Sequence, residues 1–227
     1  MTYVIPPPKQ PALPVVGTDQ LFPVNRVFCI GRNYAAHAVE MGHDPDKEPP
    51  FFFFKSPSSL TSDGVFPYPS MSSDVHHELE MTVALSRGGN DILVDHALDH
   101  VFGYGVGLDM TRRDLQSEAK AMGRPWEVGK SFEKSAPCGP LVPVAVCGHP
   151  DEGAVTLDIN GKRRQTGDLN QMIWKVPEVI AILSRYFALQ PGDVIMTGTP
   201  SGVGPVERGD TMHAKITGVG ELTVNVI

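Results

Sequence analysis

Apolar and polar positions alternate through much of the chain from residue 27 onward, and this pattern predicts a protein built mainly from short strands. Residues 155–165 alternate up to Asn160-Gly161, a dipeptide that favours a two-residue hairpin turn. Residues 210–227 have the pattern of a second, closing hairpin. Residues 192–198 follow a proline and begin with Gly-Asp, so they predict a short buried strand after a turn.

Three segments carry helical signals instead. Residues 33–41 predict a short helix that Gly42 terminates. Residues 111–122 begin with a Thr-x-x-Asp capping pattern and end at Gly123. Residues 177–188 start with proline in the first turn and carry an apolar stripe at Val179, Ile180, Leu183 and Phe187. Many short strands, few helices and no strict βαβ rhythm predict a β-rich α+β fold.

The N-terminal segment differs from the rest in composition. Residues 1–25 are rich in proline and predict an extended arm, either free or packed against the body or a partner subunit. The remaining residues, 26–227, predict a single domain, because a chain of 227 residues has the length of one domain with a sizeable core.

Charge and cysteine content narrow the possible partners and locations. The formal net charge of −7 argues against a nucleic-acid or anionic-membrane partner, which needs a clustered basic surface. It leaves an anionic substrate open, because a metal ion and a few cations can reverse the field inside a cleft. The chain has no apolar run of membrane-spanning length, and its start lacks the features of a signal peptide. Cys29, Cys138 and Cys147 lack metal-site spacing and predict buried thiols in a reducing compartment, so we expect a cytoplasmic location.

Residues 76–85, HHELEMTVAL, have the most informative pattern for function. Read as a strand, they place apolar residues on one face and Glu78 and Glu80 on the other, about 7 Å apart. Carboxylates so close repel each other unless a cation lies between them, although a solvent-exposed strand face would have the same pattern. His77 falls on the core side of this strand, so we expect it to pack or to support the ligands.

A third carboxylate, Asp109, ends the Gly-rich strand predicted for residues 103–110. The glycines permit close backbone approach, and sites tend to form where strands end; an ordinary acid at a helix N-terminus is the alternative. Glu78, Glu80 and Asp109 together offer three carboxylates and no thiolate, a donor set that suits Mg²⁺ or Mn²⁺.

Two further pairs of residues each share a helix face. His37 and Glu40 are three residues apart, and a carboxylate that orients an imidazole makes a general base; an ordinary surface pair is the alternative. Arg113 and Gln116 follow the third carboxylate with the same spacing, and are placed to hold an anionic ligand unless they form a solvated helix face.

Two loops add candidates for anion binding. Lys130 is a candidate for stabilising an anion, and residues 197–205 offer backbone N–H groups and the Thr199 hydroxyl for a carboxylate; a plain Gly/Pro turn is the alternative for that loop. Rival motifs are missing from the sequence. It contains no dinucleotide-binding GxGxxG opening a helix, no GxSxG nucleophile elbow, no P-loop and no HExxH.

Taken together, these segments resemble the fumarylacetoacetate hydrolase family, most closely its acylpyruvate and fumarylpyruvate hydrolase branch. The resemblance runs from about Phe28 to the C-terminus and leaves only the Pro-rich arm unexplained. Its motifs occur in the order GRNYAAHAVEM, HHELEMTVAL, GYGVGLDMTRRDLQ, GKSFEKSAPCGP, INGKRRQ and VIMTGTPSGVGP.

The resemblance implies a mixed β-sandwich or β-roll fold of the fumarylacetoacetate hydrolase C-terminal-domain type and a homodimer. It implies one Mg²⁺ or Mn²⁺ per subunit, on Glu78, Glu80 and Asp109. The implied catalytic residues are a lid pair, His37 and Glu40, together with Lys130. The implied substrate contacts are Arg113, Gln116 and Thr199.

The implied activity is hydrolysis of the carbon–carbon bond of an acylpyruvate, with fumarylpyruvate cleaved to fumarate and pyruvate in gentisate-type aromatic catabolism. His37, oriented by Glu40, would take a proton from the attacking water, and Lys130 would stabilise the oxyanion. The second carboxylate of fumarylpyruvate needs a basic partner, for which Arg32, Arg124 and Lys55 are unranked candidates.

Two alternatives to hydrolysis stay open. One is oxaloacetate decarboxylation or dienoate tautomerisation within the same family. The other is a non-catalytic dicarboxylate-binding protein, although no motif residue is missing.

Overall fold

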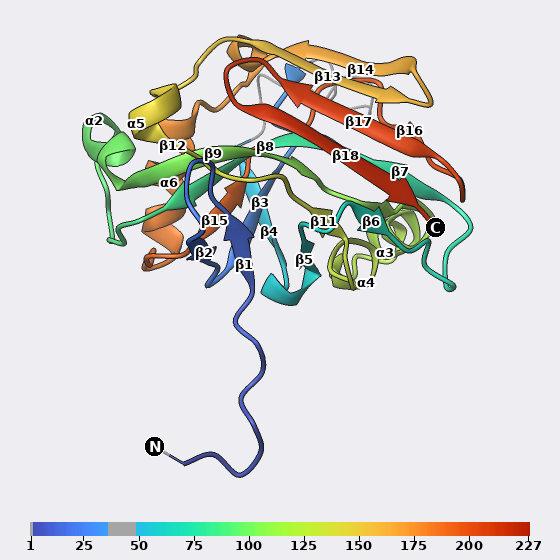
Figure 1. The fold of residues 1–227 in the computed structure, drawn as a ribbon, viewed down its shortest axis with the longest axis horizontal. Coiled ribbons are helices and arrows are strands. Elements are labelled where there is room, and N and C mark those ends of the chain that lie inside the picture. Colours follow the sequence, from blue (N-terminus) through green and yellow to red (C-terminus); the bar gives the residue numbers. More distant parts are fainter. Residues whose placement is uncertain (1, 36–48) are drawn as a thin grey trace.

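Most of the short alternating segments pair into two large β-sheets, which Figure 1 shows one above the other. The computed structural model describes residues 2–35 and 49–227. Within these residues the first sheet has six strands, in the order β12 (Val142–Pro143), β9 (Val101–Leu108), β8 (Leu79–Leu85), β15 (Val194–Met196), β3 (Val27–Gly31) and β4 (Phe51–Lys55). Neighbouring strands are antiparallel except β15 and β3, which are parallel.

The second sheet contains both predicted hairpins. Over the same described residues it has five strands, in the order β14 (Lys162–Asp168), β13 (Ala154–Ile159), β17 (Thr211–Ile216), β18 (Gly220–Val226) and β6 (Val65–Phe66). Asn160 and Gly161 connect β13 to β14 with φ values of 51° and 74°, which is the left-handed backbone that a two-residue hairpin turn needs. The hairpin predictions are confirmed.

The main hydrophobic core lies between the two sheets. Met81 and Val83 of β8 belong to the same buried cluster as Leu157 of β13 and Val224 of β18. Strand β9 also contacts β17 and β18 directly. The apolar face predicted for residues 76–85 is therefore the face that the second sheet covers, and the predicted β-rich, mixed sandwich is confirmed.

A hairpin from the N-terminal segment covers part of the other face of the six-stranded sheet. Strands β1 (Ala12–Pro14) and β2 (Leu21–Pro23) are antiparallel. Leu13 and Phe22 share a second buried cluster with Cys29, Ala84 and Met196. Residues 2–9 are exposed and lead away from the body (Figure 1).

Short elements complete the fold. The α-helices described are α2 (Val94–Ala97), α3 (Arg113–Ala121), α4 (Glu127–Lys130), α5 (Val144–Cys147) and α6 (Val176–Tyr186). The 3₁₀ turns described are η1 (Pro57–Ser59), η2 (Leu98–His100) and η3 (Leu169–Gln171). One small sheet has three strands, in the order β10 (Thr111–Arg112), β7 (Val75–His77) and β16 (Gly204–Pro205). Another consists of β11 (Ala136–Pro137) and β5 (Leu60–Thr61). None of the helices in the described part of the chain has the length and apolar character of a membrane span.

The predicted helices are only partly confirmed. The first, 33–41, lies mostly outside the described residues. The second begins at Arg113 rather than residue 111, and its capping prediction is wrong: Thr111 is in a strand, and its hydroxyl is 3.1 Å from the Asp109 carbonyl. The third is present as α6, with Pro177 in its first turn.

The prediction of one strand over residues 76–85 is also wrong at one position. Strand β7 ends at His77 and strand β8 begins at Leu79, so Glu78 lies between them. The two strands belong to different sheets. The Leu79 N–H donates to Gln165 Oε1 at 3.0 Å, and the Glu78 carbonyl accepts from the Asp109 N–H at 2.8 Å. The Leu79 N–H therefore bonds to a distant segment at this point, while the bond from Asp109 continues the pairing of β8 with β9.

Candidate metal centre and active site

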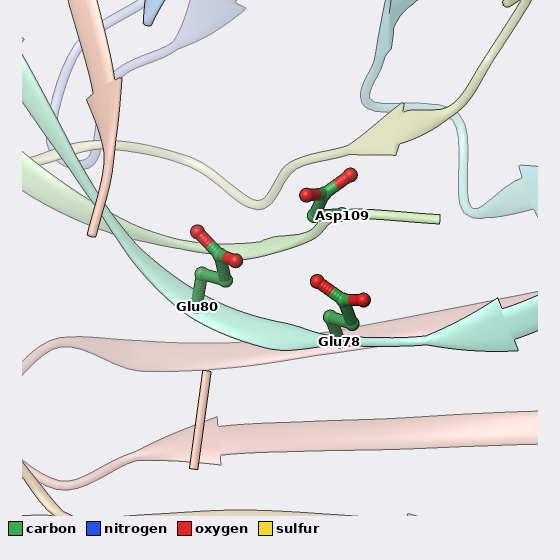
Figure 2. A group of neighbouring side chains, drawn as sticks. All are labelled: Glu78, Glu80 and Asp109. Atoms are coloured by element: carbon green, nitrogen blue, oxygen red, sulfur yellow. The ribbon is translucent and has the colours of Figure 1, made fainter. Parts of the chain in front are cut away.

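Three buried carboxylates meet where β8 and β9 lie side by side. Glu80 is on β8, Glu78 directly precedes that strand, and Asp109 directly follows β9. The strands are antiparallel with Leu79 opposite Leu108, so the start of β8 lies beside the end of β9. Carboxylate oxygens of the three residues lie within 4.8 Å of one another, and Figure 2 shows the side chains gathered around one space. This is the grouping predicted from the sequence.

Glycines in β9 allow the two strands to approach closely at this site. Gly107 lies opposite Glu80, and a Cβ at Gly107 would come within 2.7 Å of Thr82 Cγ2. A Cβ at Gly105 would come within 2.8 Å of Thr82 Oγ1. A larger residue at either position would push β9 away from β8 and separate Asp109 from Glu80.

Three cationic side chains compensate the carboxylates. Lys130 Nζ donates to Glu78 Oε2 at 2.8 Å and to Asp109 Oδ2 at 2.7 Å. Arg113 Nη2 donates to Glu78 Oε1, and Lys55 Nζ lies 2.8 Å from Asp109 Oδ1. Burial alone would lower the pKa of Lys130, but the two carboxylates outweigh it and the pKa is raised, so the ammonium group stays charged.

Glu80 has no such cation bonded to it among the residues that the structure describes. It is 2% exposed, and within the described part of the chain it accepts one hydrogen bond, from the Gly198 N–H at 2.8 Å. Burial raises its pKa well above the usual range, and the neighbouring Asp109 and Glu78 raise it further. Gly198 has a φ of 89°, and a Cβ there would come within 2.8 Å of Asn33, so glycine brings this N–H to the carboxylate.

This donor set fits a divalent cation. Asp109 Oδ1 accepts no hydrogen bond among the described residues, because Lys55 Nζ approaches it outside the direction of a hydrogen bond. Together with Glu80 it offers buried negative oxygens that hard ions such as Mg²⁺ and Mn²⁺ prefer. The three cationic side chains already balance the three carboxylates, so a divalent ion would make the site positive and suited to an anionic substrate.

Arg113 and Gln116 share one face of α3, as predicted, and adjoin the carboxylates. Arg113 Nη1 donates to Gln116 Oε1 at 2.6 Å, while Nη2 of the same guanidinium contacts Glu78. A Cβ at Gly129 would lie 2.9 Å from the Gln116 backbone nitrogen, so this glycine allows α4 to pack against α3. Lys130 is the next residue and is placed by that packing.

The position of Thr199 depends on Gln165, a residue that the sequence reasoning did not single out. Gln165 Nε2 donates to Thr199 Oγ1 at 2.8 Å and to the Pro200 carbonyl at 2.9 Å. Its Oε1 accepts from the Leu79 N–H and lies 3.0 Å from His77 Nδ1. Gln165 therefore joins the loop that carries Thr199 to the start of β8. The only signal for it was its place in the INGKRRQ motif.

His77 is buried near the carboxylates without joining them, as expected of a supporting residue. Burial lowers its pKa to about 4, so the imidazole is neutral at neutral pH. The Pro200 carbonyl can only accept, which fixes the orientation of the Gln165 amide and makes its Oε1 an acceptor. His77 Nδ1 therefore carries the proton.

The predicted lid pair, His37 and Glu40, lies outside the described residues. The chain that leads to this pair is held by Asn33, which is fully buried. Asn33 Nδ2 donates to the Thr197 carbonyl at 2.8 Å and the Trp174 carbonyl at 2.9 Å, and its Oδ1 accepts from the Trp174 N–H at 2.7 Å. This anchoring role was not predicted.

A cleft opens over the carboxylates. The predicted substrate residues Arg113, Gln116 and Thr199 line it, together with Lys130. Two more cations, Arg32 and Lys120, also line it. The remaining wall contains the aromatic rings of Phe51, Phe53 and Trp126.

Of the three basic residues considered for a second substrate carboxylate, Arg32 lines this cleft. Lys55 is buried against Asp109, and Arg124 is an exposed residue 3.9 Å from Glu118. Lys55 and Arg124 are therefore in the wrong place for that role.

Comparison with known proteins identifies the family. Residues 26–227 match the family model of the fumarylacetoacetate (FAA) hydrolase C-terminal domain. The chain belongs to the fumarylacetoacetate hydrolase family. A crystal structure of fumarylpyruvate hydrolase from Pseudomonas aeruginosa, in complex with Mn²⁺ and pyruvate, is 50% identical, with a TM-score of 0.97 over 100% of this chain and 99% of that one.

Curated relatives within the family carry more than one activity, among them fumarylpyruvate hydrolysis, oxaloacetate tautomerisation and oxaloacetate decarboxylation. A fumarylpyruvate hydrolase of a Ralstonia species is 42% identical over 192 residues, which cover 82% of this chain and 98% of the relative. A mitochondrial oxaloacetate tautomerase of Arabidopsis thaliana is 41% identical over 201 residues, which cover 88% and 90%. The predicted family and fold are confirmed, the fumarylpyruvate hydrolase branch is supported, and the Mn²⁺ of the solved family member agrees with the donor set of Glu78, Glu80 and Asp109.

Proposed function

We propose that the protein is a divalent-metal-dependent hydrolase that cleaves the carbon–carbon bond of an acylpyruvate, with fumarylpyruvate as its main substrate. The observation that carries this proposal is the buried Glu80, which lies beside Glu78 and Asp109 and is bonded to no cation among the described residues, at the base of a cleft lined by cations. The 50% identity to a fumarylpyruvate hydrolase that binds Mn²⁺ and pyruvate supports the choice of substrate.

The protein would act as a homodimer in the cytoplasm. In each subunit the three carboxylates would hold the metal. When bound, it would supply positive charge for the carboxylate end of the substrate and for the negative charge that develops as the bond breaks. Arg113 bonds to Gln116 and Glu78, and its remaining N–H groups at the cleft would orient that carboxylate. The Thr199 hydroxyl, which accepts a hydrogen bond from Gln165, would donate to the substrate from the loop that follows β15.

The water chemistry is assigned to residues that the family resemblance names. His37, oriented by Glu40, would take a proton from the water that attacks the distal carbonyl. Lys130 reaches the cleft with a charged ammonium group and would stabilise the oxyanion that forms. The carbon–carbon bond then breaks to release pyruvate and the free acid of the acyl group.

Oxaloacetate tautomerisation is the second candidate. A relative of 41% identity carries that activity, and the same site would bind oxaloacetate through its keto-acid end. Decarboxylation of oxaloacetate needs no attacking water, so it depends less on His37.

Substrate assays with the metal-free and metal-loaded protein test the proposal. The protein is stripped with a chelator, reloaded with Mg²⁺ or Mn²⁺, and given fumarylpyruvate, acetylpyruvate or oxaloacetate, while pyruvate release and the enol absorbance are followed. We expect pyruvate from fumarylpyruvate only in the loaded protein, at least about tenfold faster in kcat/KM than from acetylpyruvate. Equal kcat/KM for the two acylpyruvates would leave a general acylpyruvase. Loss of the oxaloacetate enol without pyruvate release from any acylpyruvate would make the protein a tautomerase.

A further inference from the structure

The cleft over the carboxylates has a second cationic region that the proposed chemistry does not use. Arg32 and Lys120 both line it, together with the rings of Phe51 and Trp126. The two rings lie edge to face with their centroids 5.3 Å apart. Arg32 Cζ is 5.2 Å from the centroid of Phe51, and Lys120 Nζ is 6.0 Å from that of Trp126. Cations and aromatic faces thus form one wall.

Helix α3 sets the spacing between this wall and the carboxylates. Arg113, Gln116 and Lys120 are at positions i, i+3 and i+7, which fall on one face of the helix. Lys120 is therefore two turns, roughly 10 Å, along the axis from Arg113. Fumarylpyruvate has six carbon–carbon bonds of about 1.5 Å each between its two carboxylate carbons, so an extended zigzag molecule measures roughly 7.5 Å between them, which is shorter than this span. The long side chains of both residues close the remaining gap.

The charge environment of Lys120 favours an anionic ligand. Lys120 makes no ion pair with any described residue, and its pKa is lowered, first by partial burial and then by the positive charges of Arg32 and Arg113. A cation that lies among other cations in a cleft gains most from a ligand that brings negative charge. Two of the three carboxylates, Glu78 and Asp109, are already paired with Arg113, Lys130 and Lys55.

We propose that Lys120, with Arg32 beside it, binds the distal carboxylate of the acyl group and so determines the preference for acylpyruvates that end in a carboxylate. This inference rests on the proposed function, because it takes the keto-acid end of the substrate to lie at Glu78, Glu80 and Asp109. The rings of Phe51 and Trp126 flank the planar, conjugated part of a fumaryl group between the two charged ends.

The test compares two substrates that differ in the distal carboxylate. Lys120→Met keeps most of the side-chain length but removes the charge. Its kcat/KM for fumarylpyruvate is expected to fall about 10- to 150-fold, mainly through KM, because the contact is remote from the reacting bond. The kcat/KM for acetylpyruvate, which lacks that carboxylate, should change little. Lys120→Arg should restore most of the preference for fumarylpyruvate.

Lys162→Met provides the matched control, because it removes the same charge from an exposed residue next to the Asn160-Gly161 turn. It should leave both substrates unaffected. The assignment would be overturned if Lys120→Met lowered kcat/KM equally for both substrates, or did not lower it for fumarylpyruvate.

A failure of the proposed function can be told apart from a failure of this subsite. If the wild-type protein cleaves neither acylpyruvate, the proposed function fails, and calorimetry with fumarylpyruvate as an unreacted ligand then tests Lys120 alone. Weaker binding to Lys120→Met than to the wild type, with unchanged binding of oxalate, supports the subsite. Equal affinity of both proteins for fumarylpyruvate would contradict the proposed subsite.

Discussion

Lys55 Nζ lies 2.8 Å from Asp109 Oδ1, and neither side chain is accessible to solvent. The same ammonium group donates to the carbonyls of Met110 and Lys130 and to Ser135 Oγ. One side chain at the end of β4 therefore holds together the segment that follows β9 and the end of α4. These two segments carry Asp109 and Lys130, so Lys55 fixes the position of a metal ligand without lining the cleft.

Replacement of Lys55 by Met should destabilise the protein strongly. It leaves Asp109 as a buried carboxylate with less compensating charge, and the loss of one partner of a buried pair typically costs about 3–5 kcal/mol. Urea unfolding of the metal-free protein measures this. Lys134→Met is the control, because Lys134 and Asp63 form an exposed pair, 36% and 51% accessible, for which we expect less than about 1 kcal/mol. Similar small losses in both variants would show that Lys55 does not stabilise Asp109.

Replacement of Gln165 by Leu should affect both stability and turnover. The Leu79 N–H and the Pro200 carbonyl lose their partner, and an unsatisfied buried group costs about 1–3 kcal/mol. The Thr199 hydroxyl also loses the bond that orients it, so kcat/KM should fall by more than the loss of folded protein explains. Unfolding and kinetics of Gln165→Leu are compared with those of Gln190→Leu, an exposed residue where the change should stay within about 0.5 kcal/mol. Unchanged kinetics in folded Gln165→Leu would mean that Thr199 needs no such support.

Local patterns in the sequence were enough to predict the parts of the site that depend on neighbouring residues. The alternation along residues 79–85 correctly separated the core face from the face of Glu80, because a strand has a period of two. Asp109 was predicted at the end of a Gly-rich strand and lies there. The hairpin at Asn160-Gly161 follows from the backbone geometry of those two residues alone.

The parts that could not be predicted depend on residues far apart in the chain. Gln165 and Thr199 are 34 positions apart, and Lys55 and Met110 are 55 apart, so neither pair has a local signal. The strand break at Glu78 has the same origin, since Gln165 takes the N–H of the next residue out of the ladder. The Pro-rich segment shows the limit of composition: its residues 12–23 form a hairpin because Leu13 and Phe22 find an apolar surface formed by later strands.

Replacement of His37 by Ala should remove water activation and leave binding intact. This prediction rests on the family resemblance, since His37 lies outside the described residues. Loss of a general base typically lowers the rate about 10²- to 10⁴-fold. Mn²⁺ binding by calorimetry and competitive inhibition by oxalate should be retained. Decarboxylation of oxaloacetate needs no attacking water, so if it fell as far as hydrolysis does, His37 would have another role.

Replacement of Glu80 by Gln separates the cost of a buried acid from its use as a metal ligand. Without metal, Glu80 is a buried carboxylate with a raised pKa and a single hydrogen bond among the described residues, so a neutral amide of the same shape should leave the stability unchanged or higher. With Mn²⁺ at about 100 times Kd, the wild type should gain about 2.7 kcal/mol, whereas the variant should gain far less because one anionic ligand is missing. Thermal unfolding with and without Mn²⁺, combined with calorimetric titration, measures both effects. Unchanged or higher stability without metal, combined with lower stability with Mn²⁺, would identify Glu80 as a metal ligand. A residue with a purely structural role would instead destabilise the metal-free protein when changed. Wild-type Mn²⁺ affinity in Glu80→Gln would show that the ion is held without this carboxylate.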